Sequence, residues 1–196
     1  MRTANLLATL GVATALLTAC AAPPPFHFYT LTAVATPSAT ASALVVALGP
    51  VTVPQMIDRP EIVVTTGPNE VNLDDFNRWA SPLQDNLSHA LATDLALQLG
   101  TSRVLLSALP AAAPPDYRVA VDVRTVESAL GDAASLDAVW TVRRTRDDRS
   151  QTGHTAVRVP VSSPGYPGIA GAHSRAVATL GKDIADAIAA LQTDAR

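Results

Sequence analysis

Three consecutive segments in the second half of the chain alternate apolar and polar side chains, and this pattern constrains the fold more than any other feature. In the first segment the apolar positions are Tyr117, Val119, Val121 and Val123. The same alternation recurs over residues 136–142 and 157–161. Because neighbouring side chains of a strand point to opposite faces, each segment predicts a strand with one buried and one wet face. Three such strands in succession predict an antiparallel meander.

Two longer segments have helical periodicity instead. In the first, leucines recur every fourth residue, at Leu83, Leu87, Leu91, Leu95 and Leu99. In the second, over residues 169–191, the apolar stripe consists of Val177, Leu180, Ile184, Ile188 and Leu191. Burying each leucine contributes about 1.5 to 3 kcal/mol, whereas a helix cap contributes about 1 kcal/mol. The stripes therefore predict two helices that pack against a sheet.

The ends of the first helix carry recognisable start and stop signals. Ser81 is expected to cap its N-terminus, with Pro82 in the first helical position and Gln84 completing a capping box. Gly100 is the expected stop.

Further strands are expected earlier in the chain. Residues 26–31 alternate, with Phe26 and Phe28 on one side, and residues 44–48 form a continuous apolar run that suits a central strand ended by Gly49-Pro50. Residues 61–66 and 70–73 flank the turn-forming Gly67-Pro68-Asn69 and predict a hairpin. Together with the helices they predict a single α+β domain over residues 26–196, a two-layer sandwich of a mainly antiparallel sheet packed by two longer helices.

The N-terminus has the parts of an export signal. Arg2 precedes an apolar stretch over residues 6–17, which is shorter than the roughly 20 residues that span a bilayer. The run Leu17-Thr18-Ala19-Cys20 resembles the lipobox of bacterial lipoproteins, in which the cysteine is acylated after the leader is removed. We therefore expect a signal peptide over residues 1–19 and a lipidated Cys20 with a Pro-rich spacer over residues 20–25. The alternative is an ordinary signal peptide followed by a chance cysteine.

Composition excludes several classes of function. Without residues 1–19 the chain has 13 basic and 17 acidic residues, which argues against a nucleic-acid partner. Cys20 is the sole cysteine, so its lipidation leaves no thiol for a disulfide, a zinc site or a nucleophile.

Candidate catalytic and metal-binding groups are sparse. The nearest approach to the G-x-S-x-G motif, over residues 100–104, lacks the last glycine. His27, His89, His154 and His173 have no metal-binding spacing, and His173 continues the apolar stripe of the last helix. The pairs Asp74-Asp75 and Asp147-Asp148 suit caps and turns. We therefore predict no catalytic residue, cofactor site or metal site.

Four arginines crowd one predicted hairpin, at Arg143, Arg144, Arg146 and Arg149. They would attract anionic headgroups or an acidic partner. Asp147 and Asp148 dilute their charge, so a solvated hairpin is the favoured interpretation.

The segment from Val53 to Val63 is too specific for an ordinary loop, because two prolines fix its path and an Asp-Arg pair lies between apolar residues. Together with five other segments, this segment resembles the PqiC family of auxiliary lipoproteins of ABC-type or MCE-type transport systems. The other segments are Phe28-Tyr29-Thr30-Leu31, residues 76–80, Pro82-Leu83, residues 116–119 and residues 172–175. The resemblance spans nearly the whole mature chain in the expected order.

The resemblance implies a non-enzymatic lipoprotein on the periplasmic face of the outer membrane, a docking subunit of a trans-envelope lipid transport system that supports membrane integrity. The implied partners are an MCE-domain periplasmic protein, the membrane itself through Cys20, phospholipid and further copies of the chain. The residues implied in partner contact are Pro54, Asp58, Arg59, Pro60, Arg78 and Trp79.

Several roles within that set stay open. Arg59 could pair with Asp58 or with a carboxylate of the partner, and Trp79 could be a core anchor or an interface hot spot. Tyr29 is equally balanced between core and contact. An alternative function is an envelope lipoprotein that assists the assembly or structural support of another outer-membrane protein. A hydrolase is disfavoured, and a buried carboxylate pair facing a cleft would revive it.

Overall fold

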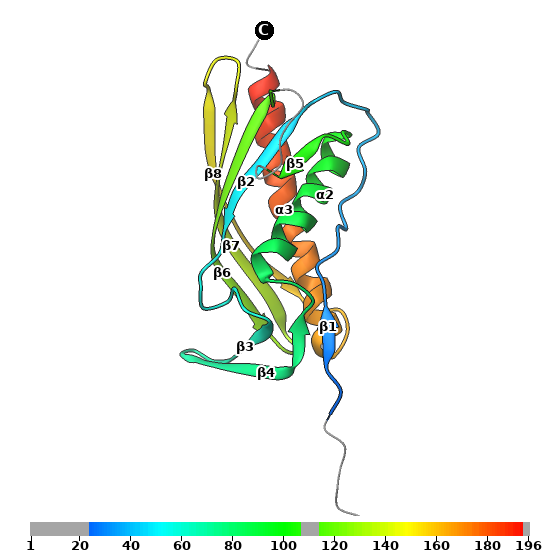
Figure 1. The fold of residues 1–196 in the computed structure, drawn as a ribbon, viewed down its shortest axis with the longest axis vertical. Coiled ribbons are helices and arrows are strands. Elements are labelled where there is room, and N and C mark those ends of the chain that lie inside the picture. Colours follow the sequence, from blue (N-terminus) through cyan, green and yellow to red (C-terminus); the bar gives the residue numbers. More distant parts are fainter. Residues whose placement is uncertain (1–23, 107–113, 194–196) are drawn as a thin grey trace, which may run out of the picture.

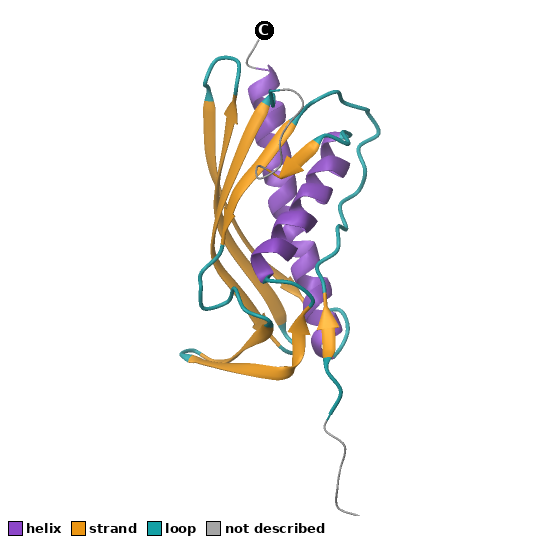
Figure 2. Ribbon diagram, viewed as in Figure 1, coloured by secondary structure: helices purple, strands orange, loops and turns teal. Residues whose placement is uncertain are grey.

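The structure is a computed structural model that describes residues 24–106 and 114–193. The expected signal peptide and Cys20 lie outside the described residues. Two sheets and two long helices form an α+β sandwich, which confirms the predicted fold class (Figures 1 and 2). The helices lie together on one face of the larger sheet, and the small sheet closes one end of the molecule.

The larger sheet has five strands in the order β5-β2-β6-β7-β8. Its strands are β2 (Val46–Thr52), β5 (Val104–Leu106), β6 (Tyr117–Ala129), β7 (Ala133–Arg144) and β8 (Ser150–Pro160). The predicted meander is confirmed, because β6, β7 and β8 pair antiparallel in sequence order. The sheet is nevertheless mixed, because β2 runs parallel to both β5 and β6.

Strand β2 is central and buried as expected, but Gly49-Pro50 does not end it. The strand passes through a cis peptide bond at Gly49-Pro50, and its pairing with β6 resumes at Val51 after a shift of register. Gly49 has a φ of 129°, which a residue with a side chain rarely adopts, so the glycine lets the strand continue through an irregular step.

The smaller sheet has the order β1-β4-β3. Its strands are β1 (His27–Tyr29), β3 (Glu61–Gly67) and β4 (Glu70–Trp79). The predicted β3–β4 hairpin is confirmed, and β4 continues past the expected end at Leu73 to Trp79. Its last residues pair in parallel with β1, through His27 opposite Asn77 and Tyr29 opposite Trp79.

The two helices are α2 (Leu83–Leu99) and α3 (Gly165–Thr193). The leucines of the α2 stripe from Leu83 to Leu95 are buried, and so is the whole predicted stripe of α3. Gly100 ends α2 with a φ of 64°, as predicted. No helix within the described ranges is long and apolar enough to cross a membrane.

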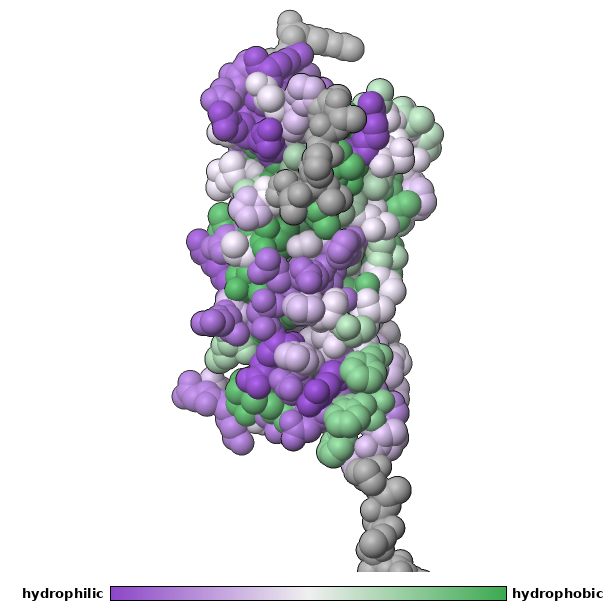
Figure 3. Space-filling model, viewed as in Figure 1, coloured by the Kyte–Doolittle hydropathy of each residue, from purple (hydrophilic) through white to green (hydrophobic). Residues whose placement is uncertain are grey.

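The face of the large sheet turned away from the helices is polar. Its exposed side chains include Arg118, Asp122, Arg143, His154 and Arg158. This arrangement confirms strands with one buried and one wet face. In the view of Figure 3, one patch of hydrophobic residues lies at the end of the molecule where β1 lies, and others lie over the middle and the opposite end.

Candidate functional site

The loop between β2 and β3 folds back on itself, and its last residue is tied to β4. The carbonyl oxygen of Pro54 accepts hydrogen bonds from the backbone N–H of Ile57 at 3.0 Å and of Asp58 at 3.2 Å. The side chain of Ile57 is buried in the core, while that of Met56 is 65% exposed. The backbone N–H of Trp79 donates to the carbonyl of Pro60 at 2.7 Å, which ties the end of the loop to β4.

Asp58 caps helix α2 from this loop. The backbone N–H of Gln84, in the first turn of the helix, donates to Asp58 Oδ1 at 3.0 Å. The expected capping box is therefore wrong: Pro82 occupies the N-cap position and makes no side-chain cap bond. Because the first N–H groups of a helix have no partner within it, a carboxylate from a neighbouring loop can replace the local cap.

Arg59 and Arg78 both bind Glu61, so within the chain Arg59 pairs with Glu61 rather than with Asp58. Arg59 Nε lies 2.9 Å from Glu61 Oε2, and the guanidinium of Arg78 lies 3.5 Å from Glu61 Oε1. The hydrogen bond from Arg59 lowers the pKa of Glu61, and the charges of both arginines add to this effect. The cluster clamps the start of β3 to the end of β4.

Trp79 lies in the core, where its side chain is 4% exposed. Its ring meets the imidazole of His173 on α3 edge to face, with centroids 6.2 Å apart. His173 Nε2 lies 2.8 Å from Ser128 Oγ, and burial lowers the pKa of His173 to about 4. Trp79 therefore has the position of a core anchor, one of the two roles that the sequence left open for it.

Asp74 connects the small sheet to the start of α3. It accepts backbone N–H bonds from Phe76 at 2.8 Å and Asn77 at 3.0 Å, but it lies within β4 beside a shift of register rather than in the expected cap or turn. It also accepts the hydroxyl of Tyr166 on α3 at 2.7 Å. Burial alone would raise the pKa of Asp74, but these hydrogen bonds lower it overall. Tyr29 joins the same network by donating to Asn77 Oδ1 at 2.8 Å.

A groove of about 400 Å³ opens beside the loop, between the β3–β4 hairpin and β6. Its apolar lining comes from Pro54, Met56, Ile57, Val63, Val71 and Val126. Charged groups of both signs also line it, from Glu70, Arg124 and Glu127. No sequence pattern indicated this groove, because its walls come from three segments that meet only in the folded chain.

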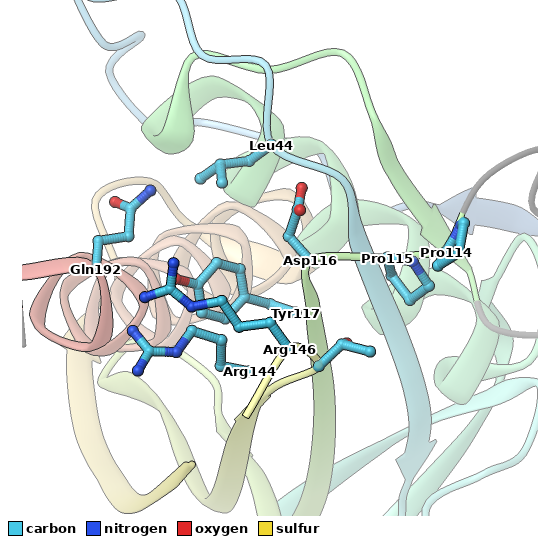
Figure 4. Close-up of a pocket in the computed structure, with 9 residues that line it drawn as sticks. Leu44, Pro114, Pro115, Asp116, Tyr117, Arg144, Arg146 and Gln192 are labelled. Carbon is cyan, nitrogen blue, oxygen red and sulfur yellow. The ribbon is translucent and has the colours of Figure 1, made fainter. Parts of the chain in front are cut away.

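A second pocket, of about 500 Å³, lies at the other end of the sheet, where Arg144, Arg146 and Gln192 surround it (Figure 4). Arg144 is buried, contrary to the expected solvated hairpin. Its guanidinium donates to the carbonyl of Leu191 and to Asp147, and the bond to Asp147 raises the pKa of Arg144. Arg143 pairs with Asp148 on the surface. The buried arginine thus ties the hairpin to the end of α3.

The described residues can be searched for grouped metal ligands and for paired buried carboxylates. They contain no cluster of three or more histidine, cysteine or acidic residues that could hold a metal. Among them, Asp94 is the one buried carboxyl group, and its Oδ1 accepts the backbone N–H groups of Val34 and Ala35. The buried carboxylate pair that would revive a hydrolase is not found in these parts of the chain.

The chain is similar to known proteins in both sequence and fold. The model of a family described as the ABC-type transport auxiliary lipoprotein component matches residues 29–185. No curated protein matches the chain significantly. An uncharacterized protein of known crystal structure gives a TM-score of 0.69 at 18% identity, covering 84% of this chain and 99% of its own. A Xanthomonas campestris protein gives 0.66 at 22% identity, covering 87% and 99%. Both share the fold.

Proposed function

Because the chain belongs to the family of ABC-type transport auxiliary lipoprotein components, we propose that it is the lipid-anchored docking subunit of an ABC/MCE-type system that moves lipid across the cell envelope. The mature protein would start at acylated Cys20 and hold one domain, residues 26–196, at the periplasmic face of the outer membrane. Its role is to bind an MCE-domain partner rather than to catalyse a reaction. The family match over residues 29–185 is the observation that carries this proposal.

The lipid anchor is supported by the sequence that precedes the family match. Cys20 follows an apolar leader at the position that a lipobox requires, and the chain has no other cysteine. Several acyl chains on one residue give stable attachment, because a single chain binds only marginally. Ala21 follows Cys20, which favours sorting to the outer membrane in Gram-negative bacteria.

The docking surface that we propose is the β2–β3 loop and its groove. Met56 and Pro60 are exposed, and Pro54 and Met56 contribute to the apolar wall. Asp58, Arg59 and Arg78 have partners within the chain, so they fix the shape of the loop before a partner arrives. Preorganisation of this kind lowers the entropy lost on binding. An apolar segment of the MCE-domain protein with charges at its ends matches the lining of the groove.

Site-specific photo-crosslinking in intact cells tests this docking surface. Benzoylphenylalanine in place of Met56 should capture an MCE-domain protein, identified by mass spectrometry. The matched control carries the same group in place of Arg118, which is exposed on the polar face of the large sheet. Equal capture from the two positions would contradict the docking surface. Failure of the full-length lipoprotein to co-purify with any MCE-domain protein after crosslinking would contradict the proposed function.

A further inference from the structure

All three phenylalanines of the chain lie on the surface at one end of the molecule, and we call Phe26, Phe28 and Phe76 the aromatic patch. Their exposed fractions are 54%, 64% and 36%. Phenylalanine is normally among the most buried residue types. A chain that places every phenylalanine outside its core therefore presents an apolar surface whose aqueous exposure is unfavourable.

The patch is organised rather than scattered. The rings of Phe26 and Phe76 lie with centroids 5.6 Å apart, and the guanidinium of Arg78 lies 5.1 Å from the centroid of the Phe26 ring. Phe26 immediately precedes β1, and Phe28 lies within it, two residues further along the chain. The parallel pairing of β1 with β4 places Phe28 opposite Arg78 and so brings Phe76 and Arg78 to this end of β1. Exposed Phe, Trp or Leu side chains combined with Lys or Arg are typical of surfaces that bury an apolar face in the headgroup region of a bilayer.

The patch also lies next to the expected lipid anchor. Five residues separate Phe26 from Cys20, so even a fully extended chain spans at most about 20 Å between them. Helix α3, with 29 residues, is about 43 Å long. An anchor at Cys20 therefore holds the β1 end near the bilayer, whereas the C-terminal end of α3 lies at the opposite end of the molecule (Figure 1). Hydrophobic residues gather at this β1 end in Figure 3.

We propose that the aromatic patch seats directly on the phospholipid leaflet that holds the acyl chains of Cys20, and so fixes the orientation of the domain on the membrane. The inference rests on the lipid anchor of the proposed function. Phe26, Phe28 and Phe76 enter the headgroup region, and Arg78 lies level with the phosphates. Asp75 is exposed beside Phe76 and offsets the positive charge of Arg78. Membrane contact by the patch therefore depends on the apolar rings rather than on excess positive charge, and it does not require anionic lipid.

Fluorescence of the full-length, acylated lipoprotein in vesicles of phosphatidylethanolamine and phosphatidylglycerol tests the seat. Acylation would occupy Cys20, so a cysteine introduced by Phe28→Cys is the only thiol open to a nitrobenzoxadiazole label. The control is Gln192→Cys, at the exposed end of α3. Quenching by spin-labelled phospholipid should be severalfold stronger at position 28 than at 192, and the emission at 28 should shift to the blue. Both results should persist in vesicles of phosphatidylethanolamine and phosphatidylcholine.

Flotation of the same samples distinguishes failure of the membrane contact by the patch from failure of the lipid anchor. Protein that floats with the vesicles but shows equal, weak quenching at both positions would overturn the seat and leave the anchor standing. A label at 28 that is shielded from aqueous iodide but not quenched by lipid would also overturn it, in favour of a protein surface or a second copy. Protein that carries no acyl group and does not float would overturn both the anchor and the seat. Phe76→Cys provides an independent label position on the patch.

Discussion

At the scale of single residues, Asp58 fills a gap in the hydrogen bonding of α2 that the helix cannot fill itself. The bond from the Gln84 N–H to Asp58 Oδ1 is the one side-chain cap that the described part of the chain supplies to this helix end. Asp58→Ala should therefore lower the free energy of unfolding by about 1 kcal/mol. Urea denaturation of the domain measures this loss.

Two further variants decide whether Asp58 acts as the cap. Asp58→Asn keeps an acceptor oxygen and should recover most of the stability. Ser81→Ala should change stability by less than about 0.5 kcal/mol, because Ser81 makes no cap bond with its side chain. A larger loss from Ser81→Ala than from Asp58→Ala would show that the local capping box operates in solution.

His173 makes the fold sensitive to acid. Burial lowers its pKa from about 6.5 to about 4, so the folded state keeps the imidazole neutral where the unfolded chain would protonate it. The contribution of the neutral His173 to the free energy of unfolding is therefore fully present above about pH 6.5 and is lost as the pH falls toward 4. We expect a loss of about 2 kcal/mol between about pH 7.5 and about pH 5, measured by urea denaturation across that range.

The control separates His173 from the carboxyl groups. His173→Gln should be less stable at neutral pH but should lose little more between about pH 7.5 and about pH 5, because acidic side chains with ordinary pKa values near 4 protonate mostly below this range. Ser128→Ala removes the hydroxyl that contacts His173 and leaves the imidazole buried, so its pH dependence should remain. An unchanged slope in His173→Gln would assign the acid sensitivity to other groups.

At the scale of elements, the contact between β7 and β8 depends on a glycine. Gly153 lies opposite Trp140 in the ladder, and a Cβ at Gly153 would come within 2.1 Å of Trp140 Cζ2. The indole cannot move freely, because its Nε1 donates to Thr155 Oγ1 at 3.0 Å and that hydroxyl donates to Asp183 on α3 at 2.6 Å. The indole is thus linked to α3 through the hydroxyl of Thr155.

Gly153→Ala should destabilise the domain by about 1 to 3 kcal/mol, the usual effect of forcing extra atoms into a packed core. Thermal and urea unfolding, compared with Thr152→Ala at the neighbouring exposed position, measure this effect. Thr152→Ala should be nearly neutral, because exposed positions tolerate substitution. Equal stability of Gly153→Ala and the parent chain would mean that the indole has room to shift.

The elements that the sequence predicts are those whose signal is local. The meander of β6 to β8 and the stripes of α2 and α3 repeat every two or about four residues, and burial of one face follows directly from that period. The parallel pairing of β2 with β6 could not be predicted in this way, because the partners are about 70 residues apart in sequence and no local pattern specifies register across such a distance. The pairing of β1 with β4 was missed for the same reason.

The same limit applies to the candidate site. The proline-rich loop is visible in the sequence, but the partners of its charged residues are not. Arg59 binds Glu61 rather than Asp58, because Asp58 is drawn to the N-terminus of α2, 26 residues further along the chain. The groove likewise needs the β3–β4 hairpin to lie beside β6. Short-range composition therefore locates the loop, while its geometry comes from the tertiary fold.

At the scale of the whole molecule, a stable domain and its location are separable properties. Among the residues that the structure describes, the buried side chains of the core belong to residues 31–191, well after the lipobox. A domain whose core does not include its anchor should fold without it. If the chain works by docking a partner at the outer membrane, location should decide its function even when the fold is unchanged.

Two variants at the lipobox test this separation. Cys20→Ala should remove the fatty-acid label and leave an unprocessed or mislocalised chain. Ala21→Asp should keep the label but retain the lipoprotein at the inner membrane, since an aspartate after the cysteine favours retention in Gram-negative bacteria. Metabolic labelling and membrane fractionation report both effects. Neither variant should protect a deletion strain from lipid-perturbing agents. The domain of Ala21→Asp should nevertheless unfold at the same urea concentration as that of the parent chain. Full protection by Ala21→Asp from the inner membrane would contradict a role that depends on the outer membrane, because the folded, acylated domain would then act from either surface.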